Sequence, residues 1–330
     1  MSRNVLITGG AGYIGSVVAR SFIARGDNVI IIDDLSHSTI HSIPKDSIFY
    51  NSNINNKDVI KEITSKYEIS ACLHFAAFIE VGESVKDPYK YFNNNTSYSI
   101  ELFNNLQNCG VNKVVFSSTA AIYGEPIYTP IDENHPKNPA NPYGLSKYFI
   151  EKFLESFSIA YDFNYVALRY FNACGADSIN YGEDHNPESH LIPLILQVPL
   201  NKREKIFIYG NDYPTKDGTC IRDYIHVSDL ASAHLAAYDY LISGGKSDVF
   251  NLGNGNGFSV QEVIDCARKV TGHNIPQEVV ERRAGDTSVL VASSQKAKDI
   301  LKWQPKYYLI EDMVKSAWDW HKNNPNGYNK

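Results

Sequence analysis

The sequence predicts an α/β protein, with a doubly wound parallel sheet followed by a smaller, irregular C-terminal domain. Three observations support this prediction. Short β-branched runs alternate with longer helical patterns in the first half, the second half is rich in Gly, Pro, Asn and Asp loops, and 330 residues suffice for about two domains. Strands separated by helices form right-handed crossovers, which give parallel sheets covered on both faces.

The expected elements follow one another in order. We expect strands at 4–8, 28–32, 71–75, 113–117 and 165–170, and helices at 13–24, about 57–67, 89–108 and about 142–161. The last helix opens with Pro142, as helix N-termini favour. We expect residues 1–175 to form the first domain and 176–330 the second, with later segments near 224–253 returning to the first.

Composition argues against several classes of protein. The net charge is -6, and no basic run offers a footprint for nucleic acid. The five cysteines are scattered without a Cys-x-x-Cys pair, which favours a reducing cytoplasm over a disulfide framework or a zinc site. The ten histidines include no His-x-His or His-Glu-x-x-His motif, so we expect no metal. No apolar run is long enough for a membrane span, so we expect a soluble protein.

A glycine run marks a candidate dinucleotide site. Gly9, Gly12 and Gly15 follow the first expected strand and open the first helix. This is the pattern of the Rossmann fold, where glycines allow a tight turn, close approach of a pyrophosphate and close helix packing. Asp33 ends the second strand, where a carboxylate receives ribose hydroxyls and repels a 2′-phosphate, so NAD is favoured over NADP. An aspartate in a surface turn is the alternative.

Two residues near the start of the long helix are candidate catalytic groups. Tyr143 and Lys147 are four apart and therefore project from one face. Tyr148 and Lys152 repeat the spacing, but an offset of five residues rotates that pair by about 140°. Both pairs cannot face one pocket. A tyrosine that merely packs on a helix face is the alternative for Tyr143.

The segment from Pro142 to Lys147, together with Ser117-Ser118-Thr119, resembles the extended branch of the short-chain dehydrogenase/reductase family. The resemblance implies that Thr119, Tyr143 and Lys147 act together, with Thr119 holding the substrate hydroxyl. A phenol with a pKa of about 10 becomes a usable base if the lysine ammonium and the nicotinium charge stabilise its phenolate.

Within that branch the chain is similar to the UDP-glucose 4-epimerase family over nearly its whole length. The matching stretches are 8–16, 81–84, 169–172, 210–215, 222–227 and 283–286. The resemblance implies NAD-dependent, reversible epimerisation at C4 of a UDP-hexose through a 4-keto sugar. It also implies a homodimer built on the helices at 89–108 and 142–161.

The same resemblance assigns contacts residue by residue. Asn172 would hold the sugar, Arg222 and Arg283 would grip the diphosphate in the bidentate manner of guanidinium groups, and Asp286 would receive the uridine ribose. Each arginine alone could equally be a surface ion-pair residue. Further cofactor contacts would come from Tyr13, Ile14, Asn53, Ile54, Phe75, Ala76, Ala77, Asn94, Ser117 and Tyr170, and further substrate contacts from His190, Leu191, Tyr224 and Leu290.

The residues after Thr119 bear on the choice between related activities. Sugar-nucleotide 4,6-dehydratases carry an Asp-Glu pair directly after the threonine, whereas Ala120 and Ala121 follow Thr119 here and can transfer no proton. A UDP-glucuronate 4-epimerase is a second rival reading. A non-catalytic NAD-binding module is a third, although such modules typically lack the Tyr and Lys pair.

Four positions depart from the usual pattern of the family. Asn53 replaces an aspartate near the adenine, Ile79 replaces a lysine near the cofactor, and His190 stands where some members have asparagine. Leu290 stands where members restricted to glucose and galactose often have tyrosine. A shorter side chain at this position leaves room for an N-acetyl group at C2, so the sequence predicts that UDP-GlcNAc and UDP-GalNAc are accepted too.

Overall fold

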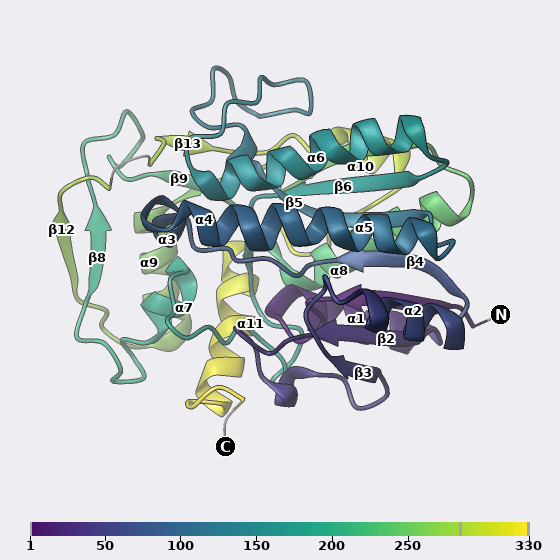
Figure 1. Ribbon diagram of the computed structural model, residues 1–330. Helices are drawn as coiled ribbons and strands as arrows, with labels where there is room; N and C mark the ends of the chain where they lie inside the picture. The colour runs from purple at the N-terminus through teal and green to yellow at the C-terminus, as the bar shows by residue number, and fades with distance from the viewer. Residues whose placement is uncertain (1, 284–285, 329–330) are drawn as a thin grey trace.

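The computed structural model describes residues 2–283 and 286–328. Its centre is a seven-stranded, wholly parallel sheet in the order β10-β6-β5-β4-β1-β2-β3 (Figure 1). The predicted fold class is therefore confirmed. The strands are β1 (Asn4–Thr8), β2 (Asn28–Asp33), β3 (Ile48–Asn51), β4 (Ile69–His74), β5 (Lys113–Thr119), β6 (Asn164–Tyr170) and β10 (Asp248–Leu252).

Helices cover both faces of this sheet. Apolar side chains of α1 (Tyr13–Arg25) and α8 (Val227–Ile242) pack on one face, and those of α2 (Lys57–Lys66), α5 (Tyr98–Asn108) and α6 (Pro142–Ala160) on the other. The shorter helices before α5 are α3 (Val81–Lys86) and α4 (Pro88–Tyr91). Among the described residues no helix is both long and apolar enough to cross a bilayer.

Two elements of the sheet domain differ from expectation. Strand β3 was not predicted, because it is a four-residue edge strand whose end residues are exposed. The helix expected at 89–108 is α4, a π-helical segment (Phe92–Ser97) and α5 in succession. Strand β10, which pairs with β6, falls within the stretch near 224–253 that was expected to return to the first domain.

The C-terminal part carries two small sheets. In the larger, β9 (Ile221–His226) lies between β11 (Gly257–Ser259) and β13 (Val289–Leu290) and also pairs with β7 (Asn172–Cys174). The smaller joins β8 (Ile206–Tyr209) to β12 (Gln277–Val280), at the left of Figure 1. Their core is shared with α7 (Leu191–Leu196), α9 (Val260–Thr271) and α11 (Ile310–Asn323), while α10 (Gln295–Ile300) packs near β10. The domain limits themselves stay a prediction.

Candidate active site

The loop from β1 to α1 depends on its glycines. Gly9 has a φ of 70°, in the left-handed region that favours glycine. A Cβ on Gly15 would lie 2.2 Å from the Gly9 carbonyl oxygen, so no side chain fits there. The first turn of α1 has no acidic residue and no side-chain cap. Its free N–H groups are therefore available to an anion such as a pyrophosphate.

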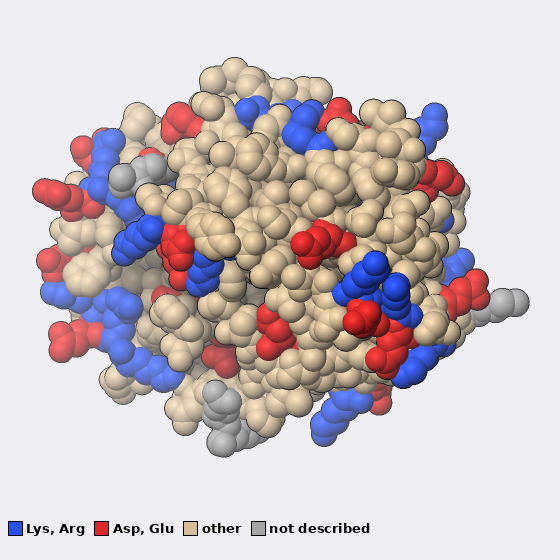
Figure 2. Space-filling model, in the orientation of Figure 1, with Lys and Arg blue, Asp and Glu red and all other residues tan. Residues whose placement is uncertain are grey.

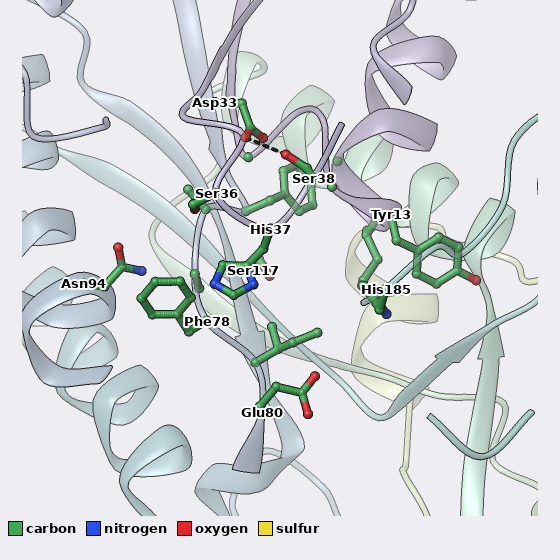
Figure 3. A pocket seen from close by; sticks show the side chains of 18 of the residues that line it. Tyr13, Asp33, Ser36, His37, Ser38, Phe78, Glu80, Asn94, Ser117 and His185 are labelled. Atoms are coloured by element: carbon green, nitrogen blue, oxygen red, sulfur yellow. Dashed lines mark hydrogen bonds between the residues drawn. The ribbon is translucent and has the colours of Figure 1, made fainter. Parts of the chain in front are cut away.

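Asp33 at the end of β2 fixes this loop. One carboxylate oxygen accepts a hydrogen bond from the Ala11 N–H at 3.0 Å, and the other accepts from the Leu35 N–H at 2.9 Å and the Ser38 hydroxyl at 2.8 Å (Figure 3). Burial raises the pKa of Asp33, and these hydrogen bonds oppose the rise. Asp33 thus organises the glycine loop and also faces the adjoining cavity.

A cavity of about 410 Å³ runs from this loop to the start of α6, a size within the usual range for ligand sites. All the residues predicted to contact the cofactor line it. They are Gly9, Gly12, Tyr13, Ile14, Gly15, Asp33, Asn53, Ile54, Phe75, Ala76, Ala77, Asn94, Ser117, Tyr143, Lys147 and Tyr170. These residues fit NAD, because a helix N-terminus without a side-chain cap and the carboxylate at the end of β2 open onto one largely apolar cleft. Their individual contacts stay predictions.

The sequence did not single out several residues of this cavity. Ser36, His37 and Ser38 line it from the loop after β2, and Phe78 and Glu80 line it from the loop after β4. His37 meets Phe78 edge-on, with ring centroids 4.8 Å apart (Figure 3). In the sequence, these residues could have been identified only by their position after the strands, because the loops at the carboxyl ends of parallel strands form the ligand-binding crevice.

Tyr143 and Lys147 face this cavity from the first turns of α6. Asn141 caps the helix by accepting a hydrogen bond from the Gly144 N–H at 2.9 Å. Lys147 is 3% exposed, and its Nζ donates to the Ser117 carbonyl oxygen at 2.9 Å. Burial lowers the pKa of Lys147 to about 7.

The surroundings of Tyr143 raise the pKa of its phenol in the absence of a cofactor. Burial is the main cause, a hydrogen bond with Thr119 opposes it, and Glu80 adds to the rise. Positive charge close to the phenol, such as the nicotinamide ring of bound NAD would add, lowers the pKa of such a group.

The rival pair on α6 points elsewhere. Tyr148 packs against an apolar cluster that includes Ile122, Ile131 and Phe171, and it does not line the cavity. Lys152 is on the surface and forms an ion pair with Glu155. The choice of Tyr143 and Lys147 over this pair is consistent with both placements.

A buried polar network holds α6 against the sheet. Arg169 of β6 donates through Nε to Glu151 of α6 at 2.9 Å and through Nη1 to the Tyr123 hydroxyl at 2.9 Å. Ser118 of β5 donates to the same glutamate at 2.5 Å. Sequence reasoning missed this network, although Arg169 lies in a stretch singled out for its resemblance. The network fixes the helix that carries the Tyr and Lys pair.

Thr119 ends β5, and the two residues directly after it, Ala120 and Ala121, have side chains that are neither acids nor bases. Its hydroxyl oxygen accepts a hydrogen bond from the Ala121 N–H at 3.1 Å, which starts the short 3₁₀ turn Ala120–Ile122. The side chain of Thr119 therefore caps the turn that follows β5.

Four of the predicted substrate residues lie on the larger of the two small sheets. Register pairs Asn172 of β7 with Tyr224 of β9, and Arg222 of β9 with Leu290 of β13. Asp286 lies between the two arginines, 3.6 Å from Nη2 of Arg222 and 3.1 Å from Nε of Arg283. Residues 284 and 285 of this stretch lie outside the described residues.

Most of these residues are separate from the cofactor cavity. Of the predicted substrate contacts, Tyr143 and His190 line the cavity, whereas Thr119, Asn172, Leu191, Arg222, Tyr224, Arg283, Asp286 and Leu290 do not. Tyr224 is only 3% exposed, within the C-terminal core. Leu191 is the first residue of α7 and packs on the same core. Their substrate roles stay predictions.

The fold and cavity define a nucleotide-dependent enzyme of the doubly wound class. Residues 5–253 match the model of the NAD dependent epimerase/dehydratase family. A UDP-glucose 4-epimerase from Halalkalibacterium halodurans is 50% identical over 325 residues, which cover 98% of this chain and 97% of that protein. The chain belongs to the NAD-dependent epimerase/dehydratase family, and NAD is its cofactor.

Solved structures give the same relationship. One UDP-glucose 4-epimerase crystal structure is 47% identical, with a TM-score of 0.97 over 99% of this chain and 100% of that one. A UDP-Glc/GlcNAc 4-epimerase from Campylobacter jejuni is 41% identical, with a TM-score of 0.87 over 97% of this chain and 99% of that one.

Proposed function

We propose that the chain inverts the configuration at C4 of UDP-hexoses, interconverting UDP-glucose and UDP-galactose. The observation that carries the proposal is the placement of Tyr143 and Lys147 at one end of the cavity that begins at the glycine loop and Asp33. A base would thereby stand beside the dinucleotide when it binds. The likeness to UDP-glucose 4-epimerases over the whole chain supports the same function.

Each residue of the proposed site has one task. Tyr143, as phenolate, accepts the proton of the sugar 4-hydroxyl, and Thr119 holds that hydroxyl. Lys147 supplies positive charge near the phenolate and is anchored by the Ser117 carbonyl. NAD, held by the glycine loop and Asp33, would supply a reversible hydride acceptor for C4, so that hydride could return to the other face of the 4-keto sugar. Tyr143 then returns its proton, so the reaction has no net redox change.

The neighbours of Thr119 favour this reaction over elimination of water. Ala120 and Ala121 occupy the positions directly after it, and neither side chain can protonate a leaving hydroxyl. The assay is incubation of the purified protein with UDP-galactose and separation of the nucleotide sugars. UDP-glucose should form without a 4-keto-6-deoxy sugar, and absence of UDP-glucose would refute the proposal.

The environment of Leu290 supports a wider substrate range that includes UDP-GlcNAc and UDP-GalNAc. Leu290 packs against the cluster of Ala120, Ile122 and Phe171, which immediately adjoins Thr119 and Asn172 in the chain. It is therefore close to the residues proposed to hold the sugar. The similarity to an enzyme described as a UDP-Glc/GlcNAc 4-epimerase agrees with this range.

Leu290→Tyr tests the wider range. The larger side chain should reduce kcat/KM for UDP-GlcNAc by roughly tenfold or more, about 1.4 kcal/mol, and change that for UDP-glucose far less. Kinetics with both substrates measure the ratio. If wild-type protein does not convert UDP-GlcNAc, or if the variant loses both activities equally, Leu290 does not set the range.

We propose that the protein is located in a reducing cytoplasm. All five cysteines are free, which suits a reducing compartment.

We also propose that two chains form a homodimer through the face over α5 and α6. This face is largely uncharged (Figure 2), and Phe149 and Ile159 of α6 are 47% and 83% exposed. Light scattering after gel filtration should give the mass of two chains. Phe149→Glu should give one chain, and a monomeric wild type would contradict the dimer.

A further inference from the structure

Four metal-ligating side chains converge in the segment 183–190. They come from Glu183, His185, Glu188 and His190, and one donor atom of each lies within 4.8 Å of all the others. The Nδ1 atom of His185 is 3.2 Å from Glu183 Oε1 and 3.8 Å from Glu188 Oε1. The Nδ1 atom of His190 also contacts Glu183 Oε1.

The cluster has an unsatisfied buried donor and a pre-oriented carboxylate. His185 Nδ1 is buried between the two carboxylates but meets neither with the geometry of a hydrogen bond. The Glu188 Oε1 atom is held by the backbone N–H groups of Ser189 and His190, at 2.8 and 2.9 Å. The side chain of Glu183 is 3% exposed. Outer hydrogen bonds that orient a carboxylate are typical of metal ligands, and a bound ion is one explanation for a buried polar atom without a hydrogen bond.

We propose that Glu183, His185, Glu188 and His190 bind one divalent transition-metal ion, with Zn²⁺ as the ion expected. Two imidazole nitrogens and two carboxylate oxygens form a four-ligand set of the kind that suits zinc. The two carboxylates neutralise the charge of the ion. With four protein ligands the ion would have no open position for substrate, so the proposed site is structural and takes no part in the reaction.

The position of the cluster gives the ion a task. His185 and His190 line the cofactor cavity, while Glu183, His185 and Glu188 line a second cavity between the glycine loop and the end of the chain after α11. His185 meets Tyr13 of α1 edge-on, with ring centroids 6.3 Å apart (Figure 3). The ion would fix the 183–190 segment against the start of α1, where the pyrophosphate is expected.

The competing explanation is a cluster held together by protons alone. Burial lowers the pKa of His185, but Glu183 and Glu188 outweigh it and raise that pKa to about 10. Protonated imidazoles beside two carboxylates would also be neutral overall. The spacing Glu-x-His-x-x-Glu-x-His differs from the histidine motifs sought in the sequence, which is why no metal was expected there.

Metal analysis distinguishes a bound ion from a cluster held together by protons. Tag-free protein is loaded with ZnCl₂, dialysed, and analysed for zinc and protein. We expect roughly one zinc ion per chain in wild type and in His41→Asn, whose histidine is exposed and outside both cavities. Glu188→Gln should lose the ion. Wild type without stoichiometric zinc, or Glu188→Gln with wild-type zinc content, would overturn the proposal.

Co²⁺ substitution and melting provide readouts independent of activity. Wild type loaded with Co²⁺ should show the strong visible bands of a four-coordinate site, and Glu188→Gln should not. Chelator should lower the melting temperature of wild type while leaving that of Glu188→Gln unchanged. Equal response of both proteins to chelator would mean that protons, not a metal, hold the cluster.

Discussion

At the residue scale, the cofactor loop depends on close contacts that tolerate no extra atom. The Gly9 carbonyl oxygen accepts a hydrogen bond from the Gly12 N–H at 3.1 Å. The same oxygen faces Gly15 so closely that a Cβ there would overlap it. Asp33 adds the hydrogen bond to Ala11. Together these contacts set the path of the backbone past the expected pyrophosphate.

Gly15→Ala should damage both the loop and the binding of NAD. Its Cβ would lie 2.2 Å from the Gly9 oxygen, whereas that of Gly12→Ala would meet the same atom at 3.3 Å, which small shifts can relieve. Gly15→Ala should therefore lower the melting temperature and weaken NAD binding by roughly tenfold or more, about 1.4 kcal/mol. Thermal melts and titration calorimetry measure both. A melting temperature that falls no further in Gly15→Ala than in Gly12→Ala would contradict this view of the loop.

His234 gives the stability a pH dependence. It is fully buried in α8, and burial lowers its pKa from 6.5 to about 4. Between pH 6.5 and pH 4 the unfolded chain binds a proton at this histidine and the folded chain does not. Protonation therefore favours the unfolded chain, and the free energy of unfolding decreases as the pH falls from 6.5 toward 4. His234→Leu should remove this loss. The difference in the free energy of unfolding between the variant and wild type should shift by about 2 kcal/mol in favour of the variant when the pH is lowered from about 7.5 to about 5. Urea unfolding at both pH values measures this shift. A constant difference across that range would contradict the buried neutral histidine.

At the element scale, one carboxylate joins β9 to two neighbouring segments. Asp223 accepts hydrogen bonds from the N–H groups of Asn254 at 2.7 Å, Gly255 at 3.0 Å and Ala292 at 3.0 Å. Burial raises its pKa to about 6, so it is mostly ionised at neutral pH. The carboxylate thereby fixes the strand that carries Arg222 and Tyr224.

Asp223→Asn should loosen this junction. The amide replaces one accepting oxygen by a donor and leaves at least one buried N–H without a partner, which costs about 1–3 kcal/mol. Urea unfolding measures the loss. Asp265→Asn is the control, because Asp265 is exposed on α9 and paired only with other surface groups there. Equal stability of the two variants would show that the three hydrogen bonds contribute little.

Sequence periodicity predicted the elements whose signal is local. β1, β2 and β5 are short β-branched runs and α6 opens with Pro142, while the glycine run directly follows β1 and Asp33 ends β2. By contrast β3 is a short edge strand with exposed end residues, and its local signal is correspondingly weak. The Arg169 and Glu151 network and the 183–190 cluster depend on tertiary contacts, so spacing alone could not reveal them.

At the scale of the whole molecule, the two parts supply different halves of the proposed site. The large sheet contributes the glycine loop, Asp33 and the Tyr143 helix, all around one cavity. The larger of the two small sheets contributes Arg222 from β9 and Leu290 from the adjacent β13, and Asp286 lies beside Arg222. Cofactor and substrate are thus proposed to bind to separate elements, and Leu290 packs on the cluster of Ala120 and Ile122 that directly follows Thr119.

The central claim is that Tyr143 is the proton acceptor at C4. The most direct test compares kcat of Tyr143→Phe and Tyr148→Phe for conversion of UDP-galactose, with NAD binding checked in both. Loss of the phenol should lower kcat by roughly 10²–10⁴-fold in Tyr143→Phe. Tyr148→Phe, whose side chain lies in an apolar cluster outside the cavity, should retain nearly full activity. Tyr143→Phe protein that binds NAD and turns over at the wild-type rate would contradict the account.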